Sequence, residues 1–348
     1  MRNKPAGAAV YGIDLGKNTF HVNRVDANGH PVQRVTLSRA TIFTFFANAK
    51  AALIGMEACL GSQWLARKLE LLGHTVRIIP AQFVKPYVKS NKNDAIDAAA
   101  IAEAVTRPTM RFVKARSTEQ VELQTLHRVR DRQVACRTQL INQMRAFCLE
   151  FGVAMRPGAG AFKVDMQKAL GDESNDLTPR MRNMLIDLMT ELAELEQKVA
   201  VTTRDIEAIA TSSELARRLT TIPGIGKLGA TAILAAVGDA KQFAKARDMA
   251  AWLGLVPAQY STGGKPTLLG MSKRGNQYIR RLLIHGARTC VLHLDRTRDC
   301  LGAWIAALEN RMHINKVVVA LANKLARVAW VVLTRPGACY LRERVTHV

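Results

Sequence analysis

Apolar and polar positions in the first 110 residues follow the pattern of a sheet covered by helices. Short apolar runs at 8–14, 20–25 and 32–37 predict three strands, and Asn28-Gly29 is a strong hairpin signal before the third. The pattern then alternates, with helix 42–50, strand 52–57, helix 63–72, strand 75–80 and a helix from about Asn93. Antiparallel strands followed by this alternation predict an α/β domain with a mixed sheet over residues 1–112.

Residues 113–212 change to a helical pattern. Ser117 and Gln120 have the spacing of a capping box, and apolar residues then recur on one helical face up to Phe151. A loop containing glycine and proline follows at 152–160, and Thr178-Pro179 begins a second helix with proline at its favoured first position. Narrow apolar seams on both helices indicate a coiled-coil connector or dimerisation arm. Ordinary core helices are the alternative.

Residues 213–348 predict a third domain that is mostly helical. Apolar helices flank the turn signal Pro223-Gly224-Ile225-Gly226, and a glycine-rich basic loop runs from Ser261 to Gly275. The most apolar stretch, 317–333, is interrupted by Asn323, Lys324 and Arg327, which favours a buried helix of a soluble domain. With no signal peptide pattern either, we expect a cytoplasmic protein with no membrane partner.

Charge narrows the class of partner. The 348 residues contain 50 Lys and Arg against 28 Asp and Glu, a formal charge of +22. Residues 211–348 alone hold 21 basic and 7 acidic side chains. Such an excess is typical of a protein that meets phosphate backbones. The six cysteines are scattered without a C-x-x-C pair, so neither a zinc site nor a disulfide framework is indicated.

Four carboxylates in the first domain are candidate metal ligands. Asp14 and Glu57 stand at the ends of two apolar strands, where a buried charge is costly unless it is compensated. Asp94 and Asp97 are three residues apart at a predicted helix start and therefore share one face. Such a set could hold two Mg²⁺ ions for phosphoryl transfer. The alternative for Asp94 and Asp97 is helix capping and a favourable interaction with the helix dipole.

Two further motifs in the last domain point to nucleic acid. The segment 221–230 is typical of a helix-hairpin-helix, in which Gly224 and Gly226 allow backbone N–H groups, beside Lys227, to approach a phosphate. A simple interhelical turn is the alternative. The basic loop and the helix after it supply further candidate phosphate contacts: Lys265, Ser272, Lys273, Arg274, Arg280 and Arg281.

The basic loop also holds Ser261 and Ser272, two of only four serines after residue 210. A serine among cations could attack phosphorus while its neighbours stabilise the developing charge, and covalent attachment would conserve the phosphodiester energy for rejoining. Phosphate binding through hydroxyls and amides, without attack, is the alternative.

These motifs together resemble a known family. Gly12-Ile-Asp14-Leu-Gly-Lys, Met56-Glu57, Lys92-Asn-Asp94-Ala-Ile-Asp97, Pro223-Gly-Ile-Gly226, Gly254-Leu-Val-Pro257 and the two serine motifs occur in the order found in IS110/IS1111 insertion-sequence transposases, relatives of the Piv/MooV invertases. The resemblance implies a RuvC-like domain of RNase H fold, a helical coiled-coil segment and a C-terminal transposase domain. It places Asp14, Glu57, Asp94 and Asp97 in an acidic tetrad that binds one or two Mg²⁺ ions.

The resemblance also assigns the catalytic serine to Ser261, with Ser272 in reserve. It implies that a bridge RNA pairs with donor and target DNA, and that dimers join into a tetramer. The implied reaction begins with attack of Ser261 on a phosphate held at the tetrad, and a 3′-hydroxyl later displaces the serine. Because tetrad and serine lie in different predicted domains, a composite site is required, within one subunit or shared between two.

Two other functions compete with this interpretation. A Holliday-junction nuclease would use metal-activated water at the tetrad and would form no covalent adduct with DNA. A non-catalytic RNA- or DNA-binding assembly factor would need only the basic charge and the hairpin motif, so acid-to-alanine changes would leave it active. The ordered tetrad favours an enzyme over the assembly factor.

Overall fold

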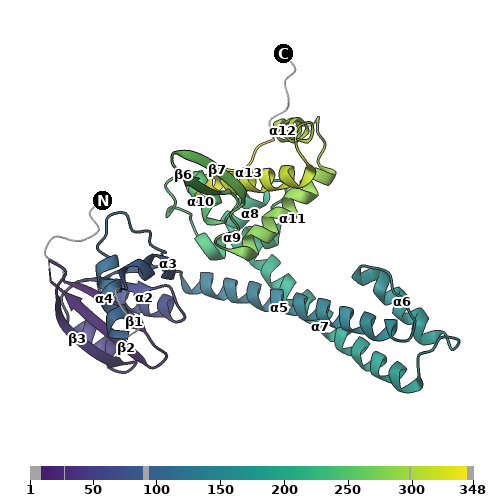
Figure 1. The fold of residues 1–348 in the computed structure, drawn as a ribbon, viewed down its shortest axis with the longest axis horizontal. Helices are drawn as coiled ribbons and strands as arrows, with labels where there is room; N and C mark the ends of the chain where they lie inside the picture. Colours follow the sequence, from purple (N-terminus) through teal and green to yellow (C-terminus); the bar gives the residue numbers. More distant parts are fainter. Residues whose placement is uncertain (1–8, 27, 89–93, 298, 343–348) are drawn as a thin grey trace, which may run out of the picture. The chain divides into compact units, whose positions relative to one another are not determined.

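The computed structural model describes residues 9–26, 28–88, 94–297 and 299–342. The chain divides into two compact units, Met1–Ser117 and Thr118–Val348 (Figure 1). The division lies close to the predicted end of the first domain at residue 112. The helical segment expected as a separate region at 113–212 belongs to the same unit as the C-terminal part.

The first unit is built on a five-stranded mixed sheet in the order β3-β2-β1-β4-β5. Its strands are β1 (Val10–Leu15), β2 (Thr19–Val25), β3 (Pro31–Ser38), β4 (Leu53–Glu57) and β5 (Thr75–Ile79). The first three pair antiparallel, and β4 joins β1 and β5 in parallel. The predicted mixed sheet is therefore confirmed, because each predicted strand carries apolar residues that a covered face can bury.

Helices cover both faces of this sheet. On one face, α1 (Ile42–Ala47) and α2 (Ser62–Leu71) pack on a core that includes Ile13 and Met56. On the other face, α4 (Asp94–Ala104) packs on Val10 and its neighbours. Successive residues of a strand face opposite sides, so β1 alternates between the two cores. A short helix α3 (Ala81–Val84) and a 3₁₀ turn at Lys85–Tyr87 lead towards α4.

Two long helices begin the second unit: α5 (Thr118–Leu149) and α7 (Pro179–Ser212). They lie side by side over much of their length (Figure 1). Helix α7 begins at Pro179 as predicted, and the Thr178 hydroxyl caps it by accepting a hydrogen bond from the Met181 backbone N–H at 3.2 Å. A helix that the sequence pattern did not predict, α6 (Ala159–Gly171), buries Phe162 and Met166 against the pair. The sequence pattern was incomplete there because α6 turns only a narrow apolar face inwards.

A buried polar contact explains why α5 belongs with the C-terminal part. The imidazole of His127 on α5 lies 3.0 Å from the Tyr278 hydroxyl and 3.0 Å from the Thr231 hydroxyl, on two different C-terminal helices. Burial lowers the pKa of His127 to about 4, so the ring is neutral at pH 7. Each of its two ring nitrogens has one of these hydroxyls as its hydrogen-bond partner. The N-terminal part of α5 is thus anchored to the C-terminal helices, while the rest of the α5–α7 pair packs with α6 in a core of its own.

The C-terminal part is a helical bundle with one hairpin. Its elements are α8 (Glu214–Thr220), α9 (Lys227–Val237), α10 (Ala246–Trp252), β6 (Pro257–Thr262), β7 (Lys265–Met271), α11 (Gln277–His293), α12 (Cys300–Glu309) and α13 (Ile314–Thr334). The apolar helix α13 is long enough to span a membrane by length and composition, yet half of its most apolar window is buried inside the fold. Leu321, Leu325 and Ala329 are among its residues in the bundle core. Its apolar character therefore serves packing, as the sequence predicts.

The predicted basic loop is in fact largely a β-hairpin. Strands β6 and β7 pair antiparallel and are joined by Gly263 and Gly264, which have φ of +57° and +76°. Two successive glycines with positive φ favour the tight turns whose twist matches that of paired strands. The loop prediction was wrong because basic and glycine residues dominate the segment, while its Gly-Gly pair carried the hairpin signal.

Candidate functional site

Three carboxylates of the first unit meet at the end of β1. Asp14 stands near the end of that strand, and Asp94 and Asp97 occupy the first turn of α4. One oxygen from each lies within 4.8 Å of the others. The sequence prediction that strand and helix bring these acids together is confirmed for this trio.

The electrostatics of the trio are unfavourable without a cation. Burial raises the pKa of Asp14 above its usual range, and the charges of Asp94 and Asp97 raise that pKa further. His21 and the backbone N–H of Leu15 act in the opposite direction. Carboxylate oxygens at this spacing are the ligands that hard divalent cations prefer, and a cation would cancel the repulsion. The donor set therefore fits a divalent metal ion.

Glu57 lies beside the trio but outside it. The β1–β4 pairing aligns Ile13 with Met56, so Glu57 follows in parallel with Asp14 at the same sheet edge. Partial burial and then the charges of Glu57 and Asp14 raise the pKa of the Cys59 thiol to about 11. Among the described residues, the group of carboxylates within mutual ligand distance comprises the other three acids. The role of Glu57 as the fourth member of the tetrad therefore stays a prediction.

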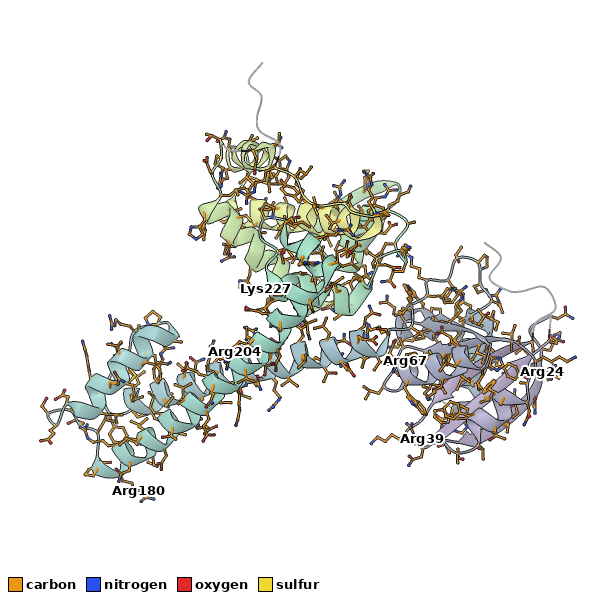
Figure 2. The ribbon with its side chains drawn as sticks, turned by 180° about the vertical axis from the view of Figure 1, so that it is seen from behind. Arg24, Arg39, Arg67, Arg180, Arg204 and Lys227 are labelled. Carbon is orange, nitrogen blue, oxygen red and sulfur yellow. The ribbon has the colours of Figure 1, made fainter. Side chains whose placement is uncertain are left out.

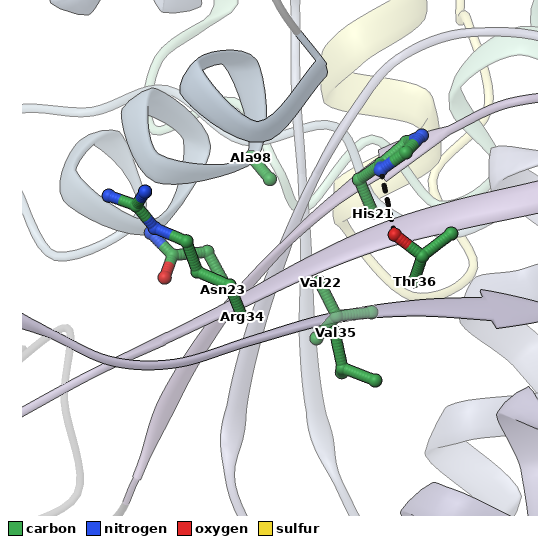
Figure 3. A pocket seen from close by; sticks show the side chains of 7 residues that line it. All are labelled: His21, Val22, Asn23, Arg34, Val35, Thr36 and Ala98. Atoms are coloured by element: carbon green, nitrogen blue, oxygen red, sulfur yellow. Dashed lines mark hydrogen bonds between the residues drawn. The ribbon is translucent and has the colours of Figure 1, made fainter.

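His21 is a site residue that the sequence analysis missed. On β2 it pairs across the strand with Asp14, and its Nε2 lies 3.3 Å from Asp94 Oδ2. Its Nδ1 lies 3.2 Å from the Thr36 hydroxyl on β3 (Figure 3). The alternation of residues along β2 could have predicted this contact, because it places His21 on the same face of the sheet as Asp14.

The position of α4 depends on Gly12. A Cβ at Gly12 would lie 2.1 Å from the carbonyl oxygen of Ala98 and 2.5 Å from the backbone nitrogen of Ala102. Both atoms belong to the backbone of α4, so no side-chain rotation can make room. The helix approaches the sheet closely enough to bring Asp94 and Asp97 to Asp14 only because residue 12 lacks a side chain.

We expect Gly12→Ala to weaken the fold and the metal site together. Moving α4 outwards should cost about 1–3 kcal/mol, as overpacking does elsewhere, and should separate Asp14 from the helix acids. Denaturant unfolding and a Mg²⁺ titration of the same protein measure both effects. Gly160→Ala in α6 is the matched control, because its Cβ would meet nothing within 4 Å. Equal behaviour of the two variants would contradict the proposed role of the close approach.

The two candidate serines differ in access to solvent. Ser261 is exposed on β6, and its Oγ accepts a hydrogen bond of 2.8 Å from Gln259 Nε2. Ser272 follows β7, and its Oγ is buried without a hydrogen-bond partner among the described residues. The hydroxyl of Ser261 is thus open to a substrate from solvent, whereas that of Ser272 is enclosed by protein.

The basic residues near the hairpin separate into two groups. Lys265, Lys273 and Arg274 are exposed. Arg280 is 8% exposed, and its guanidinium donates to the carbonyl oxygens of Leu253 and Arg274 at 2.9 Å each. Arg281 is half-exposed and forms an ion pair with Asp131. The inclusion of Arg280 among the expected phosphate contacts therefore needs correction, because its charge already serves buried carbonyl groups.

The turn between α8 and α9 is held closely against α11. Gly224 has a φ of +80°, and a Cβ there would lie 2.7 Å from the carbonyl oxygen of Gly286. Gly226 is the exposed N-cap of α9, and Lys227 follows it at the helix start (Figure 2). The Lys227 amine lies 4.0 Å from a Glu207 carboxylate oxygen. Packing thus accounts for Gly224, while Gly226 and Lys227 face outwards.

Comparisons with known proteins cover both units. A family model described as "Transposase", of the DEDD IS110 type, matches residues 11–151, and a model for the "Transposase IS116/IS110/IS902 family" matches residues 216–300. A "Probable family 20 transposase" of Pseudomonas aeruginosa is 45% identical over 94% of this chain and 97% of its own length. The "Transposase for insertion sequence element IS1328" of Yersinia enterocolitica is 43% identical over 94% and 97%, respectively. The corresponding IS1111A protein of Coxiella burnetii is 41% identical over 94% and 90%.

Proposed function

Because this chain belongs to the IS116/IS110/IS902 family of transposases, we propose that it cuts and rejoins DNA with a serine nucleophile and a metal-binding acidic tetrad. The transposase activity follows from membership of this family. Two separate observations support the mechanism: the first unit holds a three-carboxylate cluster, and the second unit holds an exposed serine on a basic hairpin. We place the reaction at DNA in the bacterial cytoplasm.

Asp14, Asp94 and Asp97 would hold one Mg²⁺ ion, and Glu57 would help to hold a second. An ion held there would supply neutralisation of the charge on the scissile phosphate and on the oxygens that enter and leave. The protein supplies the placement: β1 fixes Asp14, α4 fixes the helix acids, and His21 orients Asp94 through its contact of 3.3 Å. His21 is therefore a positioning residue in this proposal.

Ser261 is the proposed nucleophile. Its Oγ attacks phosphorus, a bond to serine forms, and the bond to the 3′ oxygen breaks, so that a 3′-hydroxyl is released and takes up the proton. A 3′-hydroxyl of the exchanged strand then attacks the same phosphorus and releases the serine hydroxyl. Each step exchanges one P–O bond for another, so rejoining needs no external energy source. Gln259 supports this role by orienting the Ser261 hydroxyl.

The nucleic-acid contacts in the proposal come from exposed cations. Lys265 lies on the serine hairpin and Lys273 and Arg274 follow it in the chain, and the helix-hairpin-helix turn offers Gly226 and Lys227. Such contacts position a duplex without reading its bases. Sequence choice is assigned to a bridge RNA that pairs with donor and target DNA, consistent with a protein charge of +22.

Assembly into dimers and then a tetramer completes the proposal. The long helix α7 leaves Met184, Ile186 and Val201 between 43% and 50% exposed, on an arm that is otherwise rich in charge. A second copy of the helix pair would bury these side chains in a helix–helix interface. The arm formed by α5 and α7 is therefore the proposed self-association element.

The test is recombination between a donor and a target plasmid with the cognate RNA and Mg²⁺ supplied. Wild type should join the plasmids, and denaturing gels should trap a covalent protein–DNA adduct. Chelating the metal should abolish both signals. Metal-dependent cleavage without an adduct would instead identify a junction nuclease that uses water, and an unchanged phenotype in acid-to-alanine variants would identify a non-catalytic assembly factor.

A further inference from the structure

The sheet face that carries Asp14 continues past α4 as a polar strip on β2 and β3. The strand pairings align Asp14 with His21 and Thr36, and align Gly12 with Asn23 and Arg34 in the next cross-strand row. Because α4 lies over Gly12, the strip beyond the helix is left as a cavity of about 120 Å³ beside Ala98 (Figure 3). Neither Asn23 nor Arg34 belongs to any of the sequence motifs.

Asn23 is the unusual member of the strip. Its side chain is 1% exposed, yet neither its amide nitrogen nor its amide oxygen has a hydrogen-bond partner within the described part of the chain. Buried carboxamides almost always find partners, because an unpaired buried donor or acceptor retains its full desolvation penalty. Asn23 lines the cavity, so the missing partners are expected from whatever occupies it.

Arg34 adds a charge to the same cavity. It lies on β3 directly across from Asn23, and Figure 3 shows the two side chains next to each other. Arg34 is exposed, and no acidic side chain of the described residues pairs with it. An occupant that suits both residues offers a planar donor–acceptor edge to the amide and an anionic group to the guanidinium.

A nucleotide has these two features, and the location favours DNA. Asn23 stands two residues from His21 along β2, a step of about 7 Å in a strand. Phosphates in one strand of duplex DNA are spaced by about 3.4 Å along the axis, so the row at Asn23 lies within a few nucleotides of the acidic cluster. A carboxamide can hydrogen-bond two neighbouring atoms of one base edge.

We infer that the Asn23–Arg34 cavity is a nucleotide subsite that holds the DNA strand beside the scissile phosphate. Asn23 hydrogen-bonds the base edge of one nucleotide, and Arg34 pairs with its phosphate. The inference rests on the proposed function, since it assumes that the acidic cluster acts on DNA. The subsite fixes the register of the strand relative to Asp14, which lies one cross-strand row away.

Photocrosslinking of the full-length protein to single-stranded oligodeoxynucleotides carrying 4-thiothymidine tests this subsite without requiring any chemistry at the cluster. Peptides from β2 and β3 should crosslink, and peptides from the β6–β7 hairpin serve as the internal reference. We expect Asn23→Leu and Arg34→Ala each to lower the β2–β3 yield at least about fivefold relative to that reference. Arg24→Ala is the matched control, because Arg24 is exposed on β2 next to Asn23, and successive strand residues face opposite sides of the sheet.

If Asn23 had a purely structural role, Asn23→Leu would lower the melting midpoint. The proposed binding role predicts the opposite effect on stability. Leucine matches the size of asparagine and removes both unpaired polar atoms, so Asn23→Leu should keep or raise the melting midpoint while losing the crosslink. Arg34→Ala changes an exposed side chain, so it still tests the subsite through the β2–β3 crosslinking yield if Asn23→Leu unfolds the protein. Equal β2–β3 yields for Arg34→Ala and Arg24→Ala would overturn the inference, as would stronger crosslinking to an RNA probe of the same length. Failure of the serine mechanism would appear only in the plasmid assay.

Discussion

Ser261→Ala is expected to lower plasmid recombination by at least about 10³-fold and to abolish the covalent adduct, because no other group replaces a lost nucleophile. Ser261 is exposed on the hairpin, and its hydroxyl already accepts a hydrogen bond from Gln259. The folded state should be little affected, since the Ser261 side chain is exposed. Quantifying joined plasmids and trapped adduct in the same reactions measures the effect.

Ser272→Ala is the matched control. The Ser272 hydroxyl is buried without a hydrogen-bond partner among the described residues, so its removal should be neutral or slightly stabilising. Recombination by this variant should stay within about threefold of wild type, because a substitution that leaves substrate contacts intact changes little transition-state stabilisation. If Ser261→Ala still recombines, the nucleophile is Ser272 or water and the assignment fails.

Asp14→Asn should produce the second large loss, again at least about 10³-fold in recombination, because removing a metal-binding carboxylate removes stabilisation of the transition state. The same variant should raise the melting midpoint of the metal-free protein at neutral pH. Burial and the neighbouring acids raise the pKa of Asp14, so its ionised form destabilises the fold increasingly as the pH rises above the ordinary range of an aspartate. Asparagine keeps the shape and removes the charge.

Thermal unfolding with and without Mg²⁺ separates these two effects. Wild type should gain stability on addition of Mg²⁺, as a protein does when an ion binds its folded state, and Asp14→Asn should lose most of that gain. Asp26→Asn is the control, since Asp26 lies outside the carboxylate trio and should leave the metal response unchanged. A wild-type melting midpoint that does not respond to Mg²⁺ would count against the metal centre itself.

Local patterns were sufficient for most of the first unit. The alternation of short apolar runs predicted β1 to β5 in order, and the spacing of Asp94 and Asp97 predicted that both lie in the first turn of one helix. These features depend on residues that are close in the sequence, so periodicity and capping carry the information. The acidic trio followed because a strand end and a helix start are both visible in the sequence.

Other features depended on contacts between distant residues. The hairpin β6–β7 was predicted as a loop, Arg280 was expected at a phosphate but hydrogen-bonds buried carbonyls, and the α5–α7 pair belongs to the second unit through His127. In each case the local sequence pattern is compatible with two environments: a loop or a hairpin, an exposed or a buried arginine, and an isolated or a packed helix pair. Only the packing partners distinguish those environments.

The sequence by itself determined the order of strands and helices in the first unit and the basic charge. It also identified Asp14, Asp94 and Asp97 as candidate metal ligands and Ser261 and Ser272 as candidate nucleophiles. Only the tertiary structure decided that Gly12 admits α4 to the sheet, that Ser272 is buried, and that Asn23 lies unpaired in a cavity. The reason is physical. Residue type and spacing determine which chemistry a side chain can carry out, whereas its burial and its contacts determine whether a substrate or an ion can reach it. Burial and contacts depend on segments that lie far apart in the chain.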